Sequence, residues 1–387
     1  MKFFKRFKKS ELINYSFIFL IILVIIFFDP IIRTINPELY EKNANKYVQR
    51  TIKTENKENG EQSINSSTSV STFSPHFSNE PIISAYPTRV EEYNLKMGGW
   101  IPSFDFNNSY QKALSSTELN SVSVVYLSLN SSGNLTNRIT LTTEQIQKLK
   151  ESGKEIFLTS TLFSPDVWST FANSPNLIKI HNQNLLDEVI KLDADGIDLD
   201  YESIPLQYKN IYLELIKDLS IKFKEKNKKI SIVFLPKSSD KENIGCCNET
   251  KQSQEIKSIE PYVDEIRIML YDYHKYVGKE GLSPISWIKS VTGYFSNQIQ
   301  NKQKLVICLP KYGYSFGPNN DIKALTNDQI KQIISQNPGL KVEITSENES
   351  SFMLNQQRYY YINDENIEVI KRYLKEQNIQ KIYVWRI

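Results

Sequence analysis

The stretch that decides the fold is Asp195-Gly196-Ile197-Asp198-Leu199-Asp200-Tyr201-Glu202, in which acidic and apolar residues alternate. Side chains of a β-strand point alternately to its two faces, so Asp198, Asp200 and Glu202 share one face and the apolar residues share the other. Helical patterns flank the stretch on both sides, which indicates a central strand covered by helices. The apolar face therefore packs against helices, and the three carboxylates point away from them.

Eight runs of this kind, rich in β-branched and aromatic residues, follow one another after Tyr86. The predicted strands are 97–104, 122–129, 155–162, 196–202, 229–235, 265–273, 304–310 and 381–386. Helical patterns between them include 143–152, 177–192, 207–226, 283–297 and 366–377. Strict alternation of strand and helix predicts a parallel sheet, and eight strands favour a closed barrel over an open sheet. The expected fold class is α/β, a (β/α)₈ TIM barrel.

One segment interrupts the alternation. Between Phe316 and Tyr361, a helical pattern at 328–336 is followed by two short strand-like runs at 341–345 and 358–362. We interpret residues 317–362 as a small α+β insertion after the seventh strand. Such an insertion lies on the carboxyl side of the barrel, where active-site walls are built.

The amino terminus has a different character. Basic residues at positions 2–9 precede the apolar run 12–28, which is typical of a transmembrane helix whose basic flank stays in the cytoplasm. A cleaved signal peptide is the alternative, but Phe27-Phe28-Asp29-Pro30 lacks the small residues of a cleavage site. We expect residues 1–28 to be a cytoplasmic tip and single-pass anchor in the cell membrane, with the remaining chain extracytoplasmic; secretion after cleavage stays open.

Residues 29–88 are expected to be a polar and largely disordered linker. The part from Thr51 to Pro81 is rich in Ser, Thr, Asn and Glu and has few large apolar residues. Such a segment buries too little apolar surface to offset the entropy of ordering. The barrel would then span residues 89–387.

Composition excludes one large class of partner. The net charge is only +3, and much of the local positive excess lies in the first ten residues, so no basic face indicates nucleic acid. Cys246, Cys247 and Cys308 match neither a disulfide framework nor the spacing of a zinc site. We interpret them as small buried or loop thiols.

The three carboxylates of the acidic strand carry the chemistry. Burying them side by side is costly unless they are protonated, hydrogen-bonded or metal-bound. A calcium loop does not fit, because Gly196 directly follows Asp195, whereas the spacing leaves a Mg²⁺ site open. Crowded carboxylates cannot all ionise, so one stays protonated near neutral pH and can donate its proton. Glu202, at the carboxyl end of the strand, is the candidate general acid.

The octapeptide resembles the D-G-x-D-x-D-x-E signature of glycoside hydrolase family 18. Met269-Leu270-Tyr271-Asp272 on the sixth predicted strand resembles the family's M-x-Y-D, and Trp385 resembles its subsite-floor tryptophan. Further segments are similar to the bacterial branch that includes spore-germination and cell-wall N-acetylglucosaminidases: 98–100, 235–237, 271–274, 309–314 and 385–386. The resemblance covers roughly residues 90 to 387. This sequence departs from that branch in one respect, because it shows no recognisable peptidoglycan-binding repeat ahead of the barrel.

The resemblance implies a retaining mechanism in which the 2-acetamido oxygen of the substrate is the nucleophile. In that mechanism Glu202 protonates the glycosidic oxygen, Asp200 orients the acetamido nitrogen, Asp198 supports Asp200, and Tyr271 hydrogen-bonds the acetamido oxygen. No metal or other cofactor is implied. The sugar that is cleaved must carry an N-acetyl group.

Six aromatic, acidic or histidine side chains are candidates for substrate binding. Most have a structural alternative: the tryptophans can instead be core residues, and His274 can be a packing histidine. Asp272 can bind sugar hydroxyls or brace Tyr271, or it can form a structural hydrogen bond at a strand end. The candidates are Trp385, Asp272, Trp100, Tyr273, His274 and Tyr312.

The sequence therefore predicts a hydrolase of β-1,4 linkages next to N-acetylglucosamine, in peptidoglycan or a chitin-like glycan. A catalytically silent, lectin-like barrel is the alternative, because fold does not guarantee chemistry. Glu202 argues against it, since silent barrels of this fold lose that residue. A third hypothesis is that the barrel serves as a scaffold in export or wall assembly, and only the predicted anchor supports it.

Overall fold

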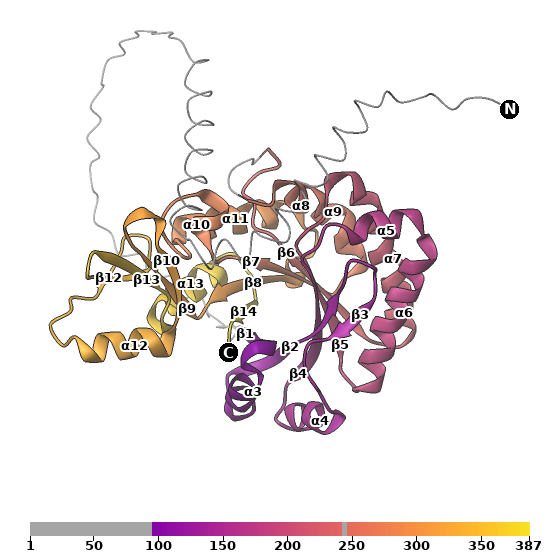
Figure 1. Ribbon diagram of the computed structural model, residues 1–387, viewed down its shortest axis with the longest axis horizontal. Helices are drawn as coiled ribbons and strands as arrows, with labels where there is room; N and C mark the ends of the chain where they lie inside the picture. The colour runs from indigo at the N-terminus through magenta and orange to yellow at the C-terminus, as the bar shows by residue number, and fades with distance from the viewer. Residues whose placement is uncertain (1–94, 242–245) are drawn as a thin grey trace, which may run out of the picture. The chain divides into compact units, whose positions relative to one another are not determined.

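The computed structural model describes residues 95–241 and 246–387. Its main sheet is a closed barrel of parallel strands in the order β1-β14-β8-β7-β6-β5-β4-β2, and β1 pairs with β2 to close the ring (Figure 1). The bounds are β1 (Lys96–Ile101), β2 (Leu119–Leu129), β4 (Glu155–Leu162), β5 (Gly196–Tyr201), β6 (Lys229–Phe234), β7 (Glu265–Met269), β8 (Leu305–Pro310) and β14 (Lys381–Trp385). The predicted α/β barrel is confirmed.

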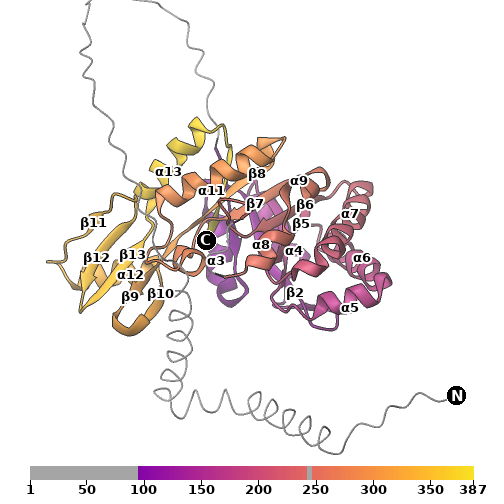
Figure 2. The same ribbon diagram turned by 90° about the horizontal axis from the view of Figure 1, so that it is seen from above.

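Helices alternate with the strands and surround the barrel (Figure 2), and short ones also lie in the loops at its carboxyl end. They are α3 (Phe106–Ser115), α4 (Thr143–Glu151), α5 (Val167–Asn173), α6 (Pro175–Lys191), α7 (Lys209–Glu225), α8 (Asn248–Ser253), α9 (Ile256–Ile259), α10 (Tyr273–Val277), α11 (Ile285–Gln298) and α13 (Asp364–Glu376). Local sequence explains where α4 and α13 begin. Thr142 and Asn363 each accept a hydrogen bond from the backbone three residues on, and the side chain there bonds back to the cap.

The chain between β8 and α13 forms a second sheet beside the barrel (Figures 1 and 2). Its antiparallel order is β10-β9-β13-β12-β11. The elements are β9 (Tyr312–Phe316), β10 (Ile322–Thr326), α12 (Asn327–Gln336), β11 (Glu343–Ile344), β12 (Ser350–Leu354) and β13 (Gln357–Tyr361). The sheet has its own small core, formed by Ile330, Phe352, Tyr359 and Tyr361. A further short strand, β3 (Leu135–Asn137), pairs antiparallel with β2.

Several strand ends differ from the sequence prediction by a few residues, and two larger differences affect the site. The sixth barrel strand ends at Met269 rather than at 273, because Asp272 takes a left-handed backbone (φ 58°) and α10 begins at the next residue. The second sheet begins at Tyr312, earlier than the predicted start of the insertion at 317. Tyr312 therefore lies in the second sheet, just beyond the end of the seventh barrel strand at Pro310.

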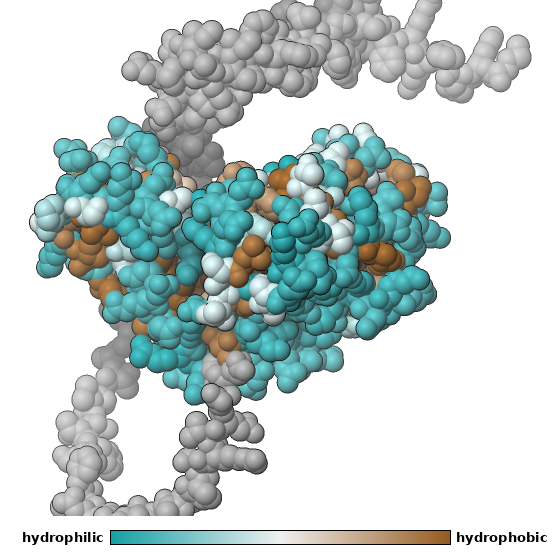
Figure 3. All heavy atoms as spheres, turned by 90° about the horizontal axis from the view of Figure 1, so that it is seen from below, coloured by the Kyte–Doolittle hydropathy of each residue, from teal (hydrophilic) through white to brown (hydrophobic). Residues whose placement is uncertain are grey.

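The predicted anchor at 1–28 and linker at 29–88 lie outside the described residues. Within 95–241 and 246–387, no helix combines the length and apolar character needed to cross a membrane. The face seen in Figure 3 is mostly hydrophilic, with apolar residues in small separate patches.

Candidate active site

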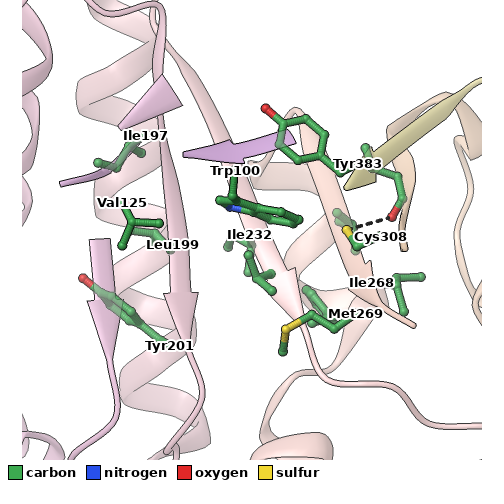
Figure 4. Close-up of a cluster of buried hydrophobic side chains, with 14 of the residues drawn as sticks. Trp100, Val125, Ile197, Leu199, Tyr201, Ile232, Ile268, Met269, Cys308 and Tyr383 are labelled. Atoms are coloured by element: carbon green, nitrogen blue, oxygen red, sulfur yellow. Dashed lines mark hydrogen bonds between the residues drawn. The ribbon is translucent and has the colours of Figure 1, made fainter. Parts of the chain in front are cut away.

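The two faces of β5 have the character that its alternation predicts. Ile197, Leu199 and Tyr201 follow one another along the strand and are fully buried (Figure 4). The hydroxyl of Tyr201 lies 2.9 Å from Nε2 of His181 on α6, and its ring packs on Trp168 of α5. This face therefore contacts the covering helices, which leaves the acidic residues to the interior of the barrel.

Asp198 lies deepest, and its carboxylate is held by three other strands. Its Oδ2 accepts hydrogen bonds from Trp100 Nε1 on β1 at 2.9 Å and from Thr159 Oγ1 on β4 at 3.1 Å. The guanidinium of Arg267 on β7 lies 3.2 Å from the same oxygen, and both charged side chains are fully buried. The positive charge and the two hydrogen bonds offset the cost of burying this carboxylate.

Arg267 was missed by the sequence analysis. Its guanidinium also pairs with Glu265, at 2.8 Å, and lies over the ring of Tyr383. The available signal was the pattern of the strand itself. Glu265 and Arg267 are two residues apart, so they share the inner face of a strand that is otherwise apolar.

Asp200 and Glu202 lie above Asp198 towards the carboxyl end of the barrel. Burial, together with the negative charges of Glu202 and Asp198, holds the pKa of Asp200 well above its ordinary value. Burial also raises the pKa of Glu202 to about 7, against a lowering by Lys275 and with further raising by Asp272 and Cys246. A protonated Glu202 is therefore abundant up to neutral pH, which suits proton donation.

The turn after β7 brings Tyr271 and Asp272 next to these acids. Tyr271 is buried, and its pKa is raised by burial and then by the charges around it, including those of Asp200 and Glu202. Asp272 Oδ1 accepts hydrogen bonds from the hydroxyls of Tyr312 and Tyr314, the latter at 3.0 Å. The second sheet therefore fixes the orientation of the Asp272 carboxylate.

The other candidates for substrate binding have different surroundings. Trp385 is partly exposed, and its ring centroid lies 6.0 Å from that of Trp100. Trp100 itself is 3% exposed, so the structure favours its core alternative. His274 packs edge-on against Tyr314 at 4.5 Å, and Tyr273 packs against Trp287 at 5.3 Å, which also favours packing roles.

One further charged group, Lys275, lies beside Glu202 and could not be predicted from the sequence. Lys275 on α10 forms an ion pair with Asp272 Oδ2 at 2.5 Å. Its cation opposes the upward shift of the Glu202 pKa. Lys275 comes to the site only through the turn at Asp272, which the predicted continuous strand 265–273 did not contain.

The carboxylates differ in how well their oxygens are satisfied. Oδ1 of Asp198 and Oδ1 of Asp200 are buried and have no hydrogen-bond partner among the described residues. Over the same residues, no group of three or more His, Cys, Asp and Glu side chains is arranged to hold a metal ion. The acidic strand can therefore hold a proton on Glu202, at its outer end, and accept a hydrogen bond at Oδ1 of Asp200, just below Glu202.

Comparisons with known proteins bear on the family and the fold. The family model for glycosyl hydrolases family 18 matches residues 97–387. The spore cortex-lytic enzyme SleL of Bacillus megaterium has a similar fold, with a TM-score of 0.65 and 14% identity over 76% of this chain and 70% of that chain. For SleL of Bacillus cereus the TM-score is 0.66 and the identity 18%, over 76% of this chain and 71% of that chain.

A chitinase from Chromobacterium violaceum is similar to the same extent, with a TM-score of 0.65 and 14% identity over 76% of this chain and 94% of that chain. At these identities the solved structures show a common fold. No curated protein matches the sequence.

Proposed function

Because the chain belongs to glycosyl hydrolase family 18, we propose that it cleaves β-1,4 linkages next to N-acetylglucosamine and retains the anomeric configuration. The observation that carries this proposal is the stack of Asp198, Asp200 and Glu202 on the inner face of one strand, with the pKa of Glu202 raised to about 7. With this pKa, Glu202 keeps a proton up to about neutral pH and can donate it to a leaving group.

The acetamido group of the substrate is the proposed nucleophile. Buried Oδ1 of Asp200, which has no partner among the described residues, supports a hydrogen bond to the acetamido N–H. The raised pKa of Tyr271 keeps its hydroxyl protonated, so it can donate to the acetamido oxygen. With the acetamide oriented between them, its oxygen attacks the anomeric carbon while Glu202 protonates the departing glycosidic oxygen.

Peptidoglycan is the proposed natural glycan, with chitin-like polymers as the second choice. Two similar structures are named as spore cortex-lytic enzymes, and several others, among them the Chromobacterium violaceum protein, are named as chitinases, so both glycans have support. The predicted anchor at 1–28 favours the wall polymer, because it would present the barrel on the outer side of the membrane. We propose this location together with the substrate.

The acetamido mechanism is tested with matched substrates. The full chain is incubated with N-acetyl chitooligosaccharides, with the same oligosaccharides after N-deacetylation, and with peptidoglycan glycan strands; new reducing ends are read by mass spectrometry. We expect cleavage only where the sugar next to the cut keeps its acetyl group. Equal cleavage of the deacetylated chains would refute substrate assistance, and binding without cleavage of any glycan would leave the lectin-like alternative.

A further inference from the structure

Cys246 and Cys247 form a thiol pair that the proposed hydrolysis does not use. They lie directly before α8, where Cys246 is partly buried and Cys247 is exposed. The third cysteine, Cys308, is fully buried on β8. The chain therefore has two accessible adjacent thiols and one enclosed thiol that serves as an internal reference.

Two hydrogen bonds connect the segment that contains this pair to the candidate active site. The backbone N–H of Cys246 donates to the carbonyl of Lys275 at 3.2 Å, in the helix that follows the Asp272 turn. Three residues beyond Cys247, the hydroxyl of Thr250 donates to the carbonyl of Glu202 at 2.9 Å. A chemical change at the thiols thus takes place in a segment bonded both to the residue that bears the acid and to the helix beside it.

The surroundings of Cys246 favour a reactive thiol. A side-chain hydrogen bond with Cys247, opposed by burial and aided by the cations of Lys251 and Lys275, lowers the pKa of Cys246 to about 7. The thiolate is the form that attacks oxidants, and redox-sensitive cysteines often lie next to a second cysteine that resolves the sulfenic acid. Cys308 has the opposite setting, since burial raises its pKa.

We propose that Cys246 and Cys247 are a peroxide-sensitive modification site at the edge of the active site, with Cys246 as the attacking thiolate and Cys247 as the resolving thiol. Cys246 sulfur attacks one oxygen of hydrogen peroxide, the O–O bond breaks, and Cys246 becomes a sulfenic acid while water leaves after protonation. The thiol of Cys247 then attacks that sulfur, its proton goes to the departing hydroxide, and a second water forms. Two thiols are oxidised to one disulfide, and one peroxide is reduced to two waters.

Oxidation changes the charge that Glu202 experiences. The Cys246 thiolate is one of the negative groups that raise the pKa of Glu202, so its conversion to a neutral disulfide lowers that pKa. The other titratable or charged groups around Glu202 keep their charges; they are Asp200 on β5, Tyr271 and Asp272 after β7, and Lys275 and Tyr276 on α10. The alkaline limb of the activity profile should therefore move to lower pH.

The test has a chemical part that is independent of hydrolysis. The reduced full chain is treated with hydrogen peroxide, the remaining thiols are alkylated, and the peptides are mapped by mass spectrometry. We expect the peptide with Cys246 and Cys247 to lose two hydrogen atoms and to escape alkylation, and dithiothreitol to restore it. Cys247→Ser should stop at a sulfenic acid that a cyclic diketone traps, and Cys246→Ser should leave Cys247 unoxidised.

Two results would overturn the chemical assignment: oxidation of Cys308 as fast as that of Cys246, or equal oxidation of Cys247 in the Cys246→Ser variant. The activity part rests on the proposed function. There, peroxide should shift the alkaline limb of the wild type to lower pH, reversibly, and leave the profile of Cys246→Ser unmoved. If the disulfide forms but the alkaline limb does not move, oxidation of Cys246 does not act on the pKa of Glu202, and that part of the proposal is wrong. Inactivity of the reduced protein on every glycan counts against the proposed hydrolase instead, and the thiol chemistry is still read by mass.

Discussion

The guanidinium of Arg267 lies 3.2 Å from the carboxylate of Asp198, and neither side chain is exposed. This pair joins β7 to β5 across the interior of the barrel, beneath the two outer acids. Asp198 in turn is one of the two carboxylates whose charge adds to the effect of burial in raising the pKa of Asp200 above it. The stability of the barrel and the protonation of the site thus depend on the same buried charges.

Removing the cation should be strongly destabilising. Arg267→Met leaves Asp198 and Glu265 buried without their partner, and breaking a buried ion pair in this way costs about 3–5 kcal/mol. Urea unfolding of the full chain measures this loss. Arg358 pairs with Glu343 at 3.7 Å on the surface, so Arg358→Met is the matched control, with an expected loss under about 1 kcal/mol. Equal losses in the two variants would show that the buried pair is not a stability element.

The lowered pKa of Glu265 predicts that the free energy of unfolding decreases at acidic pH. Burial opposes its ionisation, yet Arg267 and Lys381 lower the pKa of Glu265 to about 2. A carboxylate with a lowered folded-state pKa stabilises the fold above its unfolded pKa, and this contribution disappears as pH falls through the folded value. The free energy of unfolding should therefore drop between about pH 4.5 and pH 2, by on the order of 3 kcal/mol from this group.

The variant Glu265→Gln isolates that contribution. In this acid range its unfolding free energy should vary less with pH than that of the wild type, measured by urea unfolding at a series of pH values. Parallel curves for the two proteins would contradict the assignment to Glu265.

The charges of Lys275 and Asp272 should move the activity profile in opposite directions. Lys275 lowers the pKa of Glu202 and Asp272 raises it. Lys275→Met should therefore shift the alkaline limb of kcat/KM to higher pH, and Asp272→Asn should shift it to lower pH. Steady-state rates from pH 5 to 9 on an N-acetyl chitooligosaccharide show both limbs. Shifts in the same direction would mean that electrostatics at Glu202 does not set the limb.

Gly196 should not tolerate a side chain. A Cβ there would lie 2.5 Å from the backbone oxygen of Lys229, which cannot move aside without disturbing β6. Gly196→Ala should destabilise the fold by about 1–3 kcal/mol or more, as overpacking does. Gly293 on α11 has open space around its Cβ position, so Gly293→Ala should instead be neutral or stabilising by about 1 kcal/mol. Thermal unfolding of both variants decides, and a stable Gly196→Ala would refute the steric account.

The barrel was predictable because its signal is local. Alternation along 195–202 and the regular spacing of strands and helices depend only on neighbours in the sequence, and β4 was predicted with its observed bounds. The ends of strands were less predictable. Leu270 and Tyr271 continue the apolar pattern beyond Met269, where β7 ends, and the left-handed backbone of Asp272 then turns the chain into α10.

The contacts around the acids were largely unpredictable. Arg267 meets Asp198 across the barrel, and no local pattern states which inward side chains on distant strands will meet. The bracing of Asp272 depends on β9, which lies between the predicted strand 304–310 and the predicted insertion and was not predicted as a strand. Sequence thus identified the acids that carry the proposed chemistry, whereas the groups that set their charge state came only with the fold.

The central claim is that Glu202 donates the proton in glycan cleavage, and the most direct measurement compares the full chain with Glu202→Gln on peptidoglycan strands and N-acetyl chitooligosaccharides. Glu214→Gln, an exposed glutamate on α7, is the control. The account predicts a loss of about 10²–10⁴-fold in kcat for Glu202→Gln with glycan binding retained, since positioned acids contribute that much. It predicts no change for Glu214→Gln. Full activity in Glu202→Gln would contradict the account.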